Sequence, residues 1–250
     1  MAGPDFLIVG CQKGGTTTLH DLVARHSRVI PAAVKEVQFF SLHYERGWDW
    51  YCQQFPGGGE GLRGEATPYY LFHPHAAERI ARHCPAARLI VLLRDPVARS
   101  LSQVFHARRL GFEPLDLAEA LAAEPARLAG ADACLARGER HLSHQEHSYL
   151  SRSRYGPQLD RYAQLFPAEQ LLVLRSEAFF ADPAGTTTQV WRFLGLEPEP
   201  LGSVQAANQG AGEAAGVAEA VLRQLEKALA GEREVMEQWL QRYGPHGTAA

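Results

Sequence analysis

The 250-residue sequence lacks several features that would assign it to a specialised class of protein. No apolar run approaches the ~20 residues that span a bilayer, and the chain does not begin with a basic segment followed by an apolar one. We therefore expect neither a membrane span nor a secretory signal. The four cysteines, Cys11, Cys52, Cys84 and Cys134, include no C-x-x-C pair. This spacing indicates independent, reduced thiols in a cytoplasmic protein and argues against a disulfide framework or a zinc site.

The sequence also has little excess charge and very little lysine. Its formal net charge is −3 at pH 7, which argues against a surface that coats nucleic acid. Of 25 lysines and arginines, three are lysines (Lys13, Lys35 and Lys227), which leaves 22 arginines. This arginine-rich composition suggests a bacterial protein. An ammonium is a compact charge with mobile donors, so Lys13 draws attention to its surroundings.

Four candidate strands alternate with helical patterns along the chain. The strands are predicted at Phe6–Gly10, Arg28–Ile30, Arg88–Leu93 and Gln170–Leu174. Three of them are continuous apolar runs, as in a parallel sheet that is covered on both faces. Helical patterns occupy 17–26, 96–108, 157–165 and 186–194. We therefore predict an α/β fold, with a P-loop-like, doubly wound parallel sheet flanked by helices.

A single domain is expected over residues 1–250. The apolar fraction of 46% supports one sizeable core, which we place at about residues 5–200. A Gly/Ala-rich connection is expected at 202–216, followed by C-terminal helices at 217–243. Apolar residues recur every four positions from Val217 to Leu229, and Glu219 and Arg223 are spaced for an ion pair on one helix.

An anion-binding loop is predicted at the end of the first strand. A glycine turn leads into the segment Gln12-Lys13-Gly14-Gly15-Thr16-Thr17-Thr18, and then a helical pattern begins. This order places backbone N–H groups, hydroxyls and one ammonium at a helix N-terminus, where anions bind. In the nucleoside-triphosphatase loop the lysine instead follows the second glycine. The alternative interpretation is an ordinary strand–turn–helix with a glycine-rich turn.

A second anion pocket is predicted after the strand at 88–93. Asp95 is suited to cap the next helix, and Pro96 to its first position. Arg94 then lies at the carboxyl end of a strand, where open α/β sheets bind ligands. Ser102 follows about two helical turns later, so its hydroxyl and the guanidinium can converge on one phosphate. The alternative is a surface arginine with an unrelated surface serine.

A candidate proton acceptor lies between these segments in the sequence. Glu36 follows Lys35 and precedes Gln38, Phe39 and Phe40. Apolar walls beside a carboxylate can tune its pKa for proton abstraction. The alternative is a solvated Lys–Glu pair next to two core aromatic residues.

Together the three segments resemble the sulfotransferases that use 3′-phosphoadenosine 5′-phosphosulfate (PAPS). The branch that they resemble comprises heparan-sulfate and other carbohydrate sulfotransferases and their bacterial relatives. Residues 12–17 are similar to the family's 5′-phosphosulfate loop, the R-D-P-x-x-R-x-x-S pattern at 94–102 to its 3′-phosphate motif, and the K-E-x-x-F-F pattern at 35–40 to the segment with the catalytic base. With further similar stretches, including Gly64-Glu65-Ala66-Thr67-Pro68, the resemblance spans about residues 5–196.

The resemblance implies a function for each segment. PAPS would be bound by residues 12–18, Arg94 and Ser102, with no metal required. Lys13 would stabilise the leaving group, and Glu36 would take a proton from an acceptor hydroxyl or amine. The residues implied to contact the acceptor are Lys35, Gln38, Phe39, Glu65, Tyr69 and Tyr70. The glutamate base favours a carbohydrate or glycoconjugate acceptor, and a small-molecule or lipid natural product is the alternative.

This sequence departs from the branch at three places. Ala66 stands where members often carry lysine, and Gln38 stands where several carry histidine. The segment Asn208-Gln209-Gly210 occupies the place of a basic loop.

Two other functions remain open from the sequence. One is a nucleotide-dependent kinase or hydrolase with a variant loop, which the position of Lys13 disfavours. The other is a non-catalytic module that binds a nucleotide or a metal. His141, His144 and His147 recur at a spacing of three, so a helix would place them on one face as a conceivable metal site. A polar helix or the rim of an acceptor site is the alternative interpretation for them.

Overall fold

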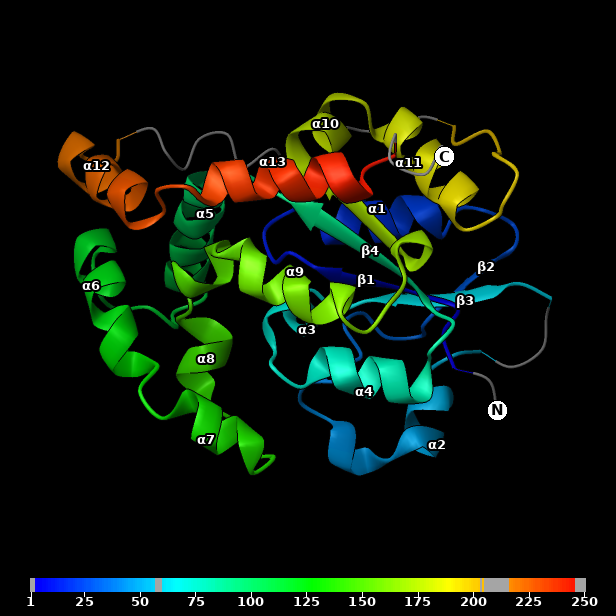
Figure 1. Cartoon of the computed structure of the whole chain (residues 1–250), viewed down its shortest axis with the longest axis horizontal. Coiled ribbons are helices and arrows are strands. Elements are labelled where there is room, and N and C mark those ends of the chain that lie inside the picture. The colour runs from blue at the N-terminus through cyan, green and yellow to red at the C-terminus, as the bar shows by residue number, and fades with distance from the viewer. Residues whose placement is uncertain (1–2, 57–59, 203, 205–215, 246–250) are drawn as a thin grey trace.

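The computed structural model describes residues 3–56, 60–202, 204 and 216–245. In this part of the chain, five parallel strands form one sheet in the order β2-β3-β1-β4-β5 (Figure 1). The strands are β1 (Phe6–Gly10), β2 (Val29–Pro31), β3 (Leu62–Ala66), β4 (Arg88–Leu93) and β5 (Leu171–Arg175). The predicted parallel sheet is therefore confirmed, with β1 at its centre between β3 and β4.

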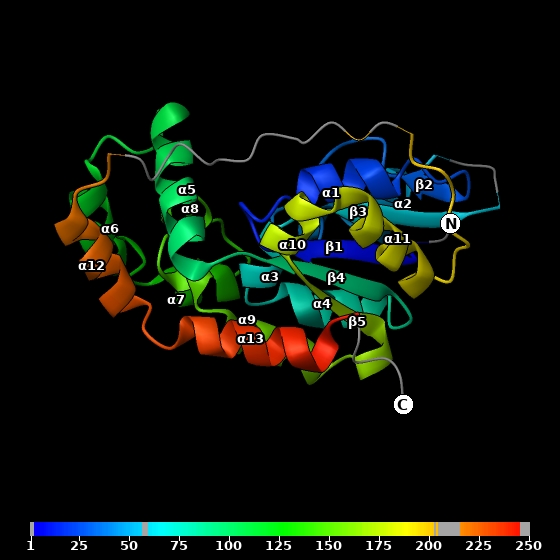
Figure 2. The ribbon, with the colours of Figure 1, turned by 90° about the horizontal axis from the view of Figure 1, so that it is seen from above.

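Helices cover both faces of the sheet (Figures 1 and 2). One face packs against α1 (Thr16–Val23), α10 (Ser176–Ala181) and α11 (Pro183–Phe193). The other face packs against α2 (Trp48–Cys52), α3 (Tyr69–Phe72), α4 (Ala76–His83), α9 (Tyr155–Ala163) and α13 (Glu232–Tyr243). The structure is thus doubly wound, and its C-terminal helix belongs to the second face.

A third group of helices lies beyond the carboxyl end of β4. In it, α5 (Pro96–Arg109) leaves that strand directly and packs on α6 (Leu117–Arg127) and α12 (Glu219–Ala228) through Val104, Leu121 and Leu225. The short helices α7 (Ala131–Ala136) and α8 (Leu142–Glu146) extend this group (Figure 1). Single 3₁₀ turns lie at Tyr44–Arg46, Ser151–Ser153 and Ala168–Gln170.

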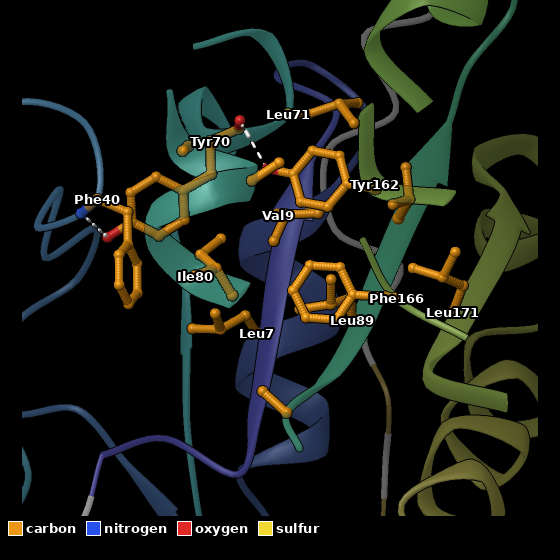
Figure 3. Packing of buried hydrophobic residues seen from close by; sticks show 14 of the residues in the cluster. Leu7, Val9, Phe40, Tyr70, Leu71, Ile80, Leu89, Tyr162, Phe166 and Leu171 are labelled. Atoms are coloured by element: carbon orange, nitrogen blue, oxygen red, sulfur yellow. Dashed lines mark hydrogen bonds between the residues drawn. The ribbon is translucent and has the colours of Figure 1, made fainter. Parts of the chain in front are cut away.

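The central strand buries both of its faces, as its uninterrupted apolar sequence predicts. Leu7 and Val9 pack toward α4 and α9, whereas Phe6 and Ile8 pack toward α1 and α11. Figure 3 shows the first of these clusters. Within it, the Tyr162 hydroxyl donates a hydrogen bond to the carbonyl of Tyr70 at 2.8 Å. These apolar layers fix β1 in place, and therefore also the loop that follows it.

The strand β3 was not among the sequence predictions, because its sequence Leu-Arg-Gly-Glu-Ala is not apolar. Two tertiary contacts explain why it is a strand. Gly64 lies against the Phe6 ring so closely that a Cβ at position 64 would come within 2.5 Å of three ring atoms. Glu65 is buried, and three hydroxyl groups donate hydrogen bonds to its carboxylate. Neither contact is visible in a local sequence pattern.

Other boundaries differ from the predictions by a few residues. The predictions for β1 and β4 match the observed bounds, whereas β2 and β5 each lie one residue later than predicted. The helices predicted at 17–26, 96–108, 157–165 and 186–194 correspond to α1, α5, α9 and α11. The predicted ion pair in the C-terminal region is confirmed, with Arg223 Nη1 at 2.5 Å from Glu219 Oε1.

Most of the predicted 202–216 connection, including Asn208-Gln209-Gly210, lies outside the described residues. Within the part of the chain that the structure describes, no helix has the length and apolar character needed to cross a membrane. The expectation of one domain over residues 1–250 stays a prediction.

Truncation of Trp191 tests the packing beneath the loop after β1. Trp191 is fully buried in α11, and its Nε1–H donates to the carbonyl of Val23 in α1 at 3.1 Å. We expect Trp191→Ala to lower the free energy of unfolding by about 3–5 kcal/mol, because it leaves a cavity. Leu142→Ala is the control, since Leu142 is 68% exposed, and it should change stability by less than about 0.5 kcal/mol. Urea denaturation measures both, and equal effects would contradict this packing.

Candidate active site

Three segments that are distant in the sequence line one cavity of about 970 Å³ at the carboxyl ends of the central strands. The loop after β1 contributes Gln12, Lys13 and residues 15–18. The segment after β2 contributes Lys35 and Glu36. The segment after β4 contributes Arg94 and, from α5, Ser102. The predicted anion loop, second anion pocket and proton acceptor therefore face the same space.

The loop between β1 and α1 leaves the N-terminus of the helix open to a ligand. Gly15 occupies the N-cap position in the left-handed conformation, with φ 98°, and has no side chain to cap the helix. The N–H groups in the first turn of α1 therefore have no side-chain cap. Such N–H groups at a helix N-terminus attract anions. A Cβ at Gly14 would lie 2.9 Å from the Leu92 carbonyl oxygen, so the close approach of the loop to β4 requires glycine.

Arg94 joins the loop after β4 to the loop after β1. Its Nη1 donates to the Lys13 carbonyl oxygen at 3.1 Å, so the two predicted anion pockets are in direct contact. The capping prediction is confirmed, because the Asp95 side chain accepts from the Ala98 N–H at 2.9 Å and Pro96 begins α5. This cap fixes the start of α5, which places Ser102 on the cavity wall.

Glu36 has the environment of a carboxylate with an elevated pKa. Burial raises its pKa, whereas the Lys35 ammonium and a hydrogen bond from Gln38 oppose that increase. The Gln38 amide Nε2 donates to Glu36 Oε2 at 3.2 Å. Both residues have left-handed backbones, with φ 52° at Glu36 and 58° at Gln38. Such conformations persist only where surrounding contacts hold them.

Glu65 supplies the contacts that hold this segment. Its Oε1 accepts hydrogen bonds from the hydroxyls of Tyr51 and Tyr70, both at 2.8 Å. Its Oε2 accepts from the Thr67 hydroxyl at 2.6 Å and from the Val37 N–H at 3.3 Å. Because Val37 directly follows Glu36, the buried carboxylate anchors the backbone next to the candidate proton acceptor.

Several residues that the resemblance implied to contact an acceptor are instead buried. Phe39 and Glu65 are each 1% exposed, and Tyr70 is fully buried. These three side chains are therefore part of the protein interior in this structure, and their contact with an acceptor stays a prediction. Tyr69 is 4% exposed, and its hydroxyl pairs with His144 Nδ1 at 2.8 Å. Lys35 lines the cavity, and Gln38 contacts Glu36.

Arg99, which belongs to the second motif, also lies inside the protein. It is fully buried, and its Nε donates to the Ser153 hydroxyl at 2.6 Å. Ser176 and Glu177 of α10 line the cavity although the sequence analysis did not propose them. The Ser176 hydroxyl donates to the Gly14 carbonyl at 2.7 Å. The location of these residues just after β5 was the available signal, since ligands bind at the carboxyl ends of parallel strands.

The three histidines near α8 have protein partners. His141 Nδ1 accepts from the His144 N–H at 3.1 Å, and the His147 ring lies 3.0 Å from the Phe112 carbonyl oxygen. Burial lowers the pKa of His144 to about 3, so this imidazole is neutral at neutral pH. Across the described residues, no group of three or more histidine, cysteine, aspartate or glutamate side chains is arranged to hold a metal ion.

The fold is a doubly wound sheet in which the two predicted anion loops are in contact at its carboxyl edge, where open α/β sheets bind ligands. Residues 3–209 match the family described as the sulfotransferase domain. The chain therefore belongs to this family of sulfotransferase enzymes.

Known relatives share this domain. Human heparan sulfate glucosamine 3-O-sulfotransferase 6 is 33% identical over 198 residues, which cover 78% of this chain and 53% of that protein. The solved structure of a sulfotransferase from Alicyclobacillus acidocaldarius is 25% identical, with a TM-score of 0.76 and coverage of 96% of this chain and 97% of that one. Mouse sulfotransferase SULT7A1 complexed with PAP shares the fold at 11% identity and a TM-score of 0.55, covering 96% of this chain and 89% of that one. The chain spans between 22% and 53% of the length of the first curated relatives that it matches.

Glu65→Gln tests whether the buried carboxylate anchors the Glu36 segment. The substitution keeps the side-chain volume but turns an NH₂ group toward hydroxyl donors. We expect a loss of about 1–3 kcal/mol in the free energy of unfolding, because buried donors lose their acceptor. Urea denaturation of this variant and of Glu60→Gln, an exposed control, provides the comparison. Equal stability of the two variants would contradict the anchoring role.

Proposed function

We propose that this chain transfers the sulfuryl group of PAPS to a hydroxyl or amine of an acceptor. One observation carries the proposal: Lys13, Glu36 and Arg94 line the same cavity although they lie far apart in the sequence. A cation at a helix N-terminus, a candidate base and a second cationic pocket are the groups that this reaction needs. We also propose that the protein acts as a single domain in the bacterial cytoplasm, which its four free cysteines and arginine-rich composition support.

The donor groups of the cavity fit a doubly phosphorylated adenosine. We assign the 5′-phosphosulfate to the N–H groups at the start of α1, to Lys13, and to the hydroxyls of Thr16 and Thr17. We assign the 3′-phosphate to Arg94 and Ser102, because a guanidinium and a hydroxyl together can bind one phosphate. The contact between Arg94 and the Lys13 carbonyl keeps these two sets of donors side by side. A kinase or hydrolase function has less support, because ATP has no 3′-phosphate for the second set.

The protein groups then act by positioning and by neutralising charge, as in phosphoryl transfer. Bound PAPS supplies the sulfuryl group, whose sulfur–oxygen bond to the 5′-phosphate breaks as the acceptor bonds to sulfur. Lys13 neutralises the charge that develops on the oxygen of the departing phosphate. Glu36 accepts the proton that the acceptor oxygen or nitrogen loses.

The acceptor that we propose is a carbohydrate or glycoconjugate. The support is the similarity to heparan sulfate sulfotransferases and the glutamate at the position of the base. The second candidate is a small-molecule or lipid natural product. It is favoured by Ala66 and Gln38, because these residues replace a cationic and an ionisable side chain of the carbohydrate branch.

Glu36→Gln tests the proton acceptor. We expect transfer to fall by about 10²–10⁴-fold, because the amide cannot accept the proton, while PAPS affinity stays close to that of the wild type. In the wild type, burial raises the pKa of Glu36. Activity should therefore rise with pH through an acid limb that lies above the range of an ordinary carboxyl, and this limb should be absent from Glu36→Gln.

The measurement is the transfer of radiolabelled sulfate from PAPS to the members of a panel of glycans, phenols and amines. Glu45→Gln, at an exposed position, is the matched control and should retain full activity. Near-normal turnover by Glu36→Gln would reject Glu36 as the base.

Lys13→Ala tests the stabilisation of the leaving group. We expect kcat to fall by about 10²–10³-fold, the usual effect of losing one group that stabilises developing charge. PAPS affinity, measured by calorimetry without acceptor, should fall by a smaller factor, because the loop N–H groups remain. Lys227→Ala removes a lysine from the exposed face of α12 and is the control. A loss confined to affinity, with unchanged kcat, would contradict this role for Lys13.

A further inference from the structure

Arg152 is a buried cation next to the anion loop, and no motif in the sequence predicted it. Arg152 is only 4% exposed. The guanidinium lies over the rings of Tyr69 and Phe72, with its carbon 4.8 and 5.1 Å from the ring centroids. Burial lowers its pKa to about 10, so it remains charged at neutral pH.

The hydrogen bonds of Arg152 within the described residues all go to neutral oxygens. Its Nη1 donates to the side-chain oxygen Oε1 of Gln12, and its Nη2 donates to the carbonyls of His144 and Gln145. Its Nε has no partner among the described residues. Glu146 and Glu124 act on this charge from a distance and raise its pKa, whereas Gln12 is the side chain that accepts a hydrogen bond from it.

The contact with Arg152 fixes the orientation of the Gln12 amide. A guanidinium has five N–H donors and no acceptor, so the oxygen of the amide must face it. The NH₂ group is then the branch of the planar amide that is directed away from Arg152, and Gln12 lines the cavity. The pair therefore presents a hydrogen-bond donor, and not an acceptor, to the space that Lys13 and Thr16 also line.

The segment that carries Arg152 is itself fixed. Glu124 of α6 is buried, and its carboxylate accepts hydrogen bonds from the N–H groups of Leu150 and Ser151 at 2.6 and 2.8 Å. The Arg152 carbonyl accepts from the Gln158 amide at 3.1 Å. The Arg152 residue is thus fixed at both ends: hydrogen bonds hold its backbone segment, and the two aromatic rings pack against its guanidinium.

We propose that Arg152 is a positioning residue that orients the Gln12 amide, so that its NH₂ group donates a hydrogen bond to an oxygen of the bound phosphosulfate. This inference rests on the proposed function; it adds Arg152 to the recognition of the donor and gives the Gln12 amide a defined role there. The same contact explains why glutamine suits position 12. A glutamate there would pair with Arg152 but would present a carboxylate oxygen to an anionic ligand.

A double-mutant cycle tests this coupling, with calorimetric titration of PAPS in the absence of acceptor. We expect Gln12→Ala to weaken PAPS binding by about 10-fold, the effect of one charge-assisted hydrogen bond. Arg152→Met should weaken it by a similar factor, and Arg152→Lys should restore part of the loss. In the Gln12→Ala background, Arg152→Met should have little further effect, because there is no amide left to orient.

Two further variants complete the experiment. Gln12→Glu keeps the shape of the side chain and the contact with Arg152, so it should fold normally and yet bind PAPS more weakly than Gln12→Ala. Arg154→Met is the control, because Arg154 is exposed and lies two residues from Arg152; its affinity should match the wild type. If Arg152→Met does not fold, Arg152→Lys and Gln12→Glu still decide the matter.

The possible outcomes separate this inference from the proposed function. One outcome is that the wild type binds PAPS and that the affinity loss of the double variant equals the product of the losses from Arg152→Met and Gln12→Ala. In that case the coupling is contradicted and the proposed function stands. Unchanged affinity in Gln12→Glu would contradict it equally. If the wild type does not bind PAPS at all, both the inference and the proposed function are wrong.

Discussion

The parallel pairing of β1 with β3 on one side and β4 on the other is the constraint on which the site depends. Parallel strands end at the same edge of a sheet, so the loops after β1 and β4 and the Thr67 turn after β3 meet there. The register aligns Leu7 with both Glu65 and Leu89. On one side of β1 the Thr67 N–H donates to the Ile8 carbonyl at 3.1 Å, and on the other side Arg94 donates to the Lys13 carbonyl in the loop that follows.

Two glutamates at this edge have different environments, which suit different roles. Glu65 is 1% exposed, and each of its oxygens accepts two hydrogen bonds. It has no free lone pair directed at the cavity and serves to hold its neighbours. Glu36 is only partly buried and lines the cavity, and among the described residues its carboxylate accepts a hydrogen bond from Gln38. Burial raises the pKa of both carboxyls, but only Glu36 is placed to exchange a proton with a ligand.

The parts of the site that could be predicted from the sequence are those with a local signal. Lys13 and the glycines follow an apolar strand, and Asp95 and Pro96 start a helix directly after another, so strand, turn and helix chemistry identified both loops. Glu65 and Arg152 have no such signal. Their roles depend on partners such as Tyr51 and Gln12, and the Gln12–Arg152 contact joins residues 140 positions apart. The strand β3 was missed for the same reason. Gly64 and Glu65 are unfavourable in a strand by themselves, and contacts with distant residues accommodate them: Gly64 packs on Phe6, and Glu65 accepts hydrogen bonds from Tyr51 and Tyr70.

The central claim is that two adjoining pockets bind the two phosphates of one nucleotide. A crystal structure of the protein with adenosine 3′,5′-bisphosphate tests it most directly. The account predicts the 5′-phosphate on the N–H groups between Gly14 and Thr17, and the 3′-phosphate on Arg94 and Ser102. A nucleotide bound elsewhere on the protein, or a 3′-phosphate that contacts neither Arg94 nor Ser102, would contradict it.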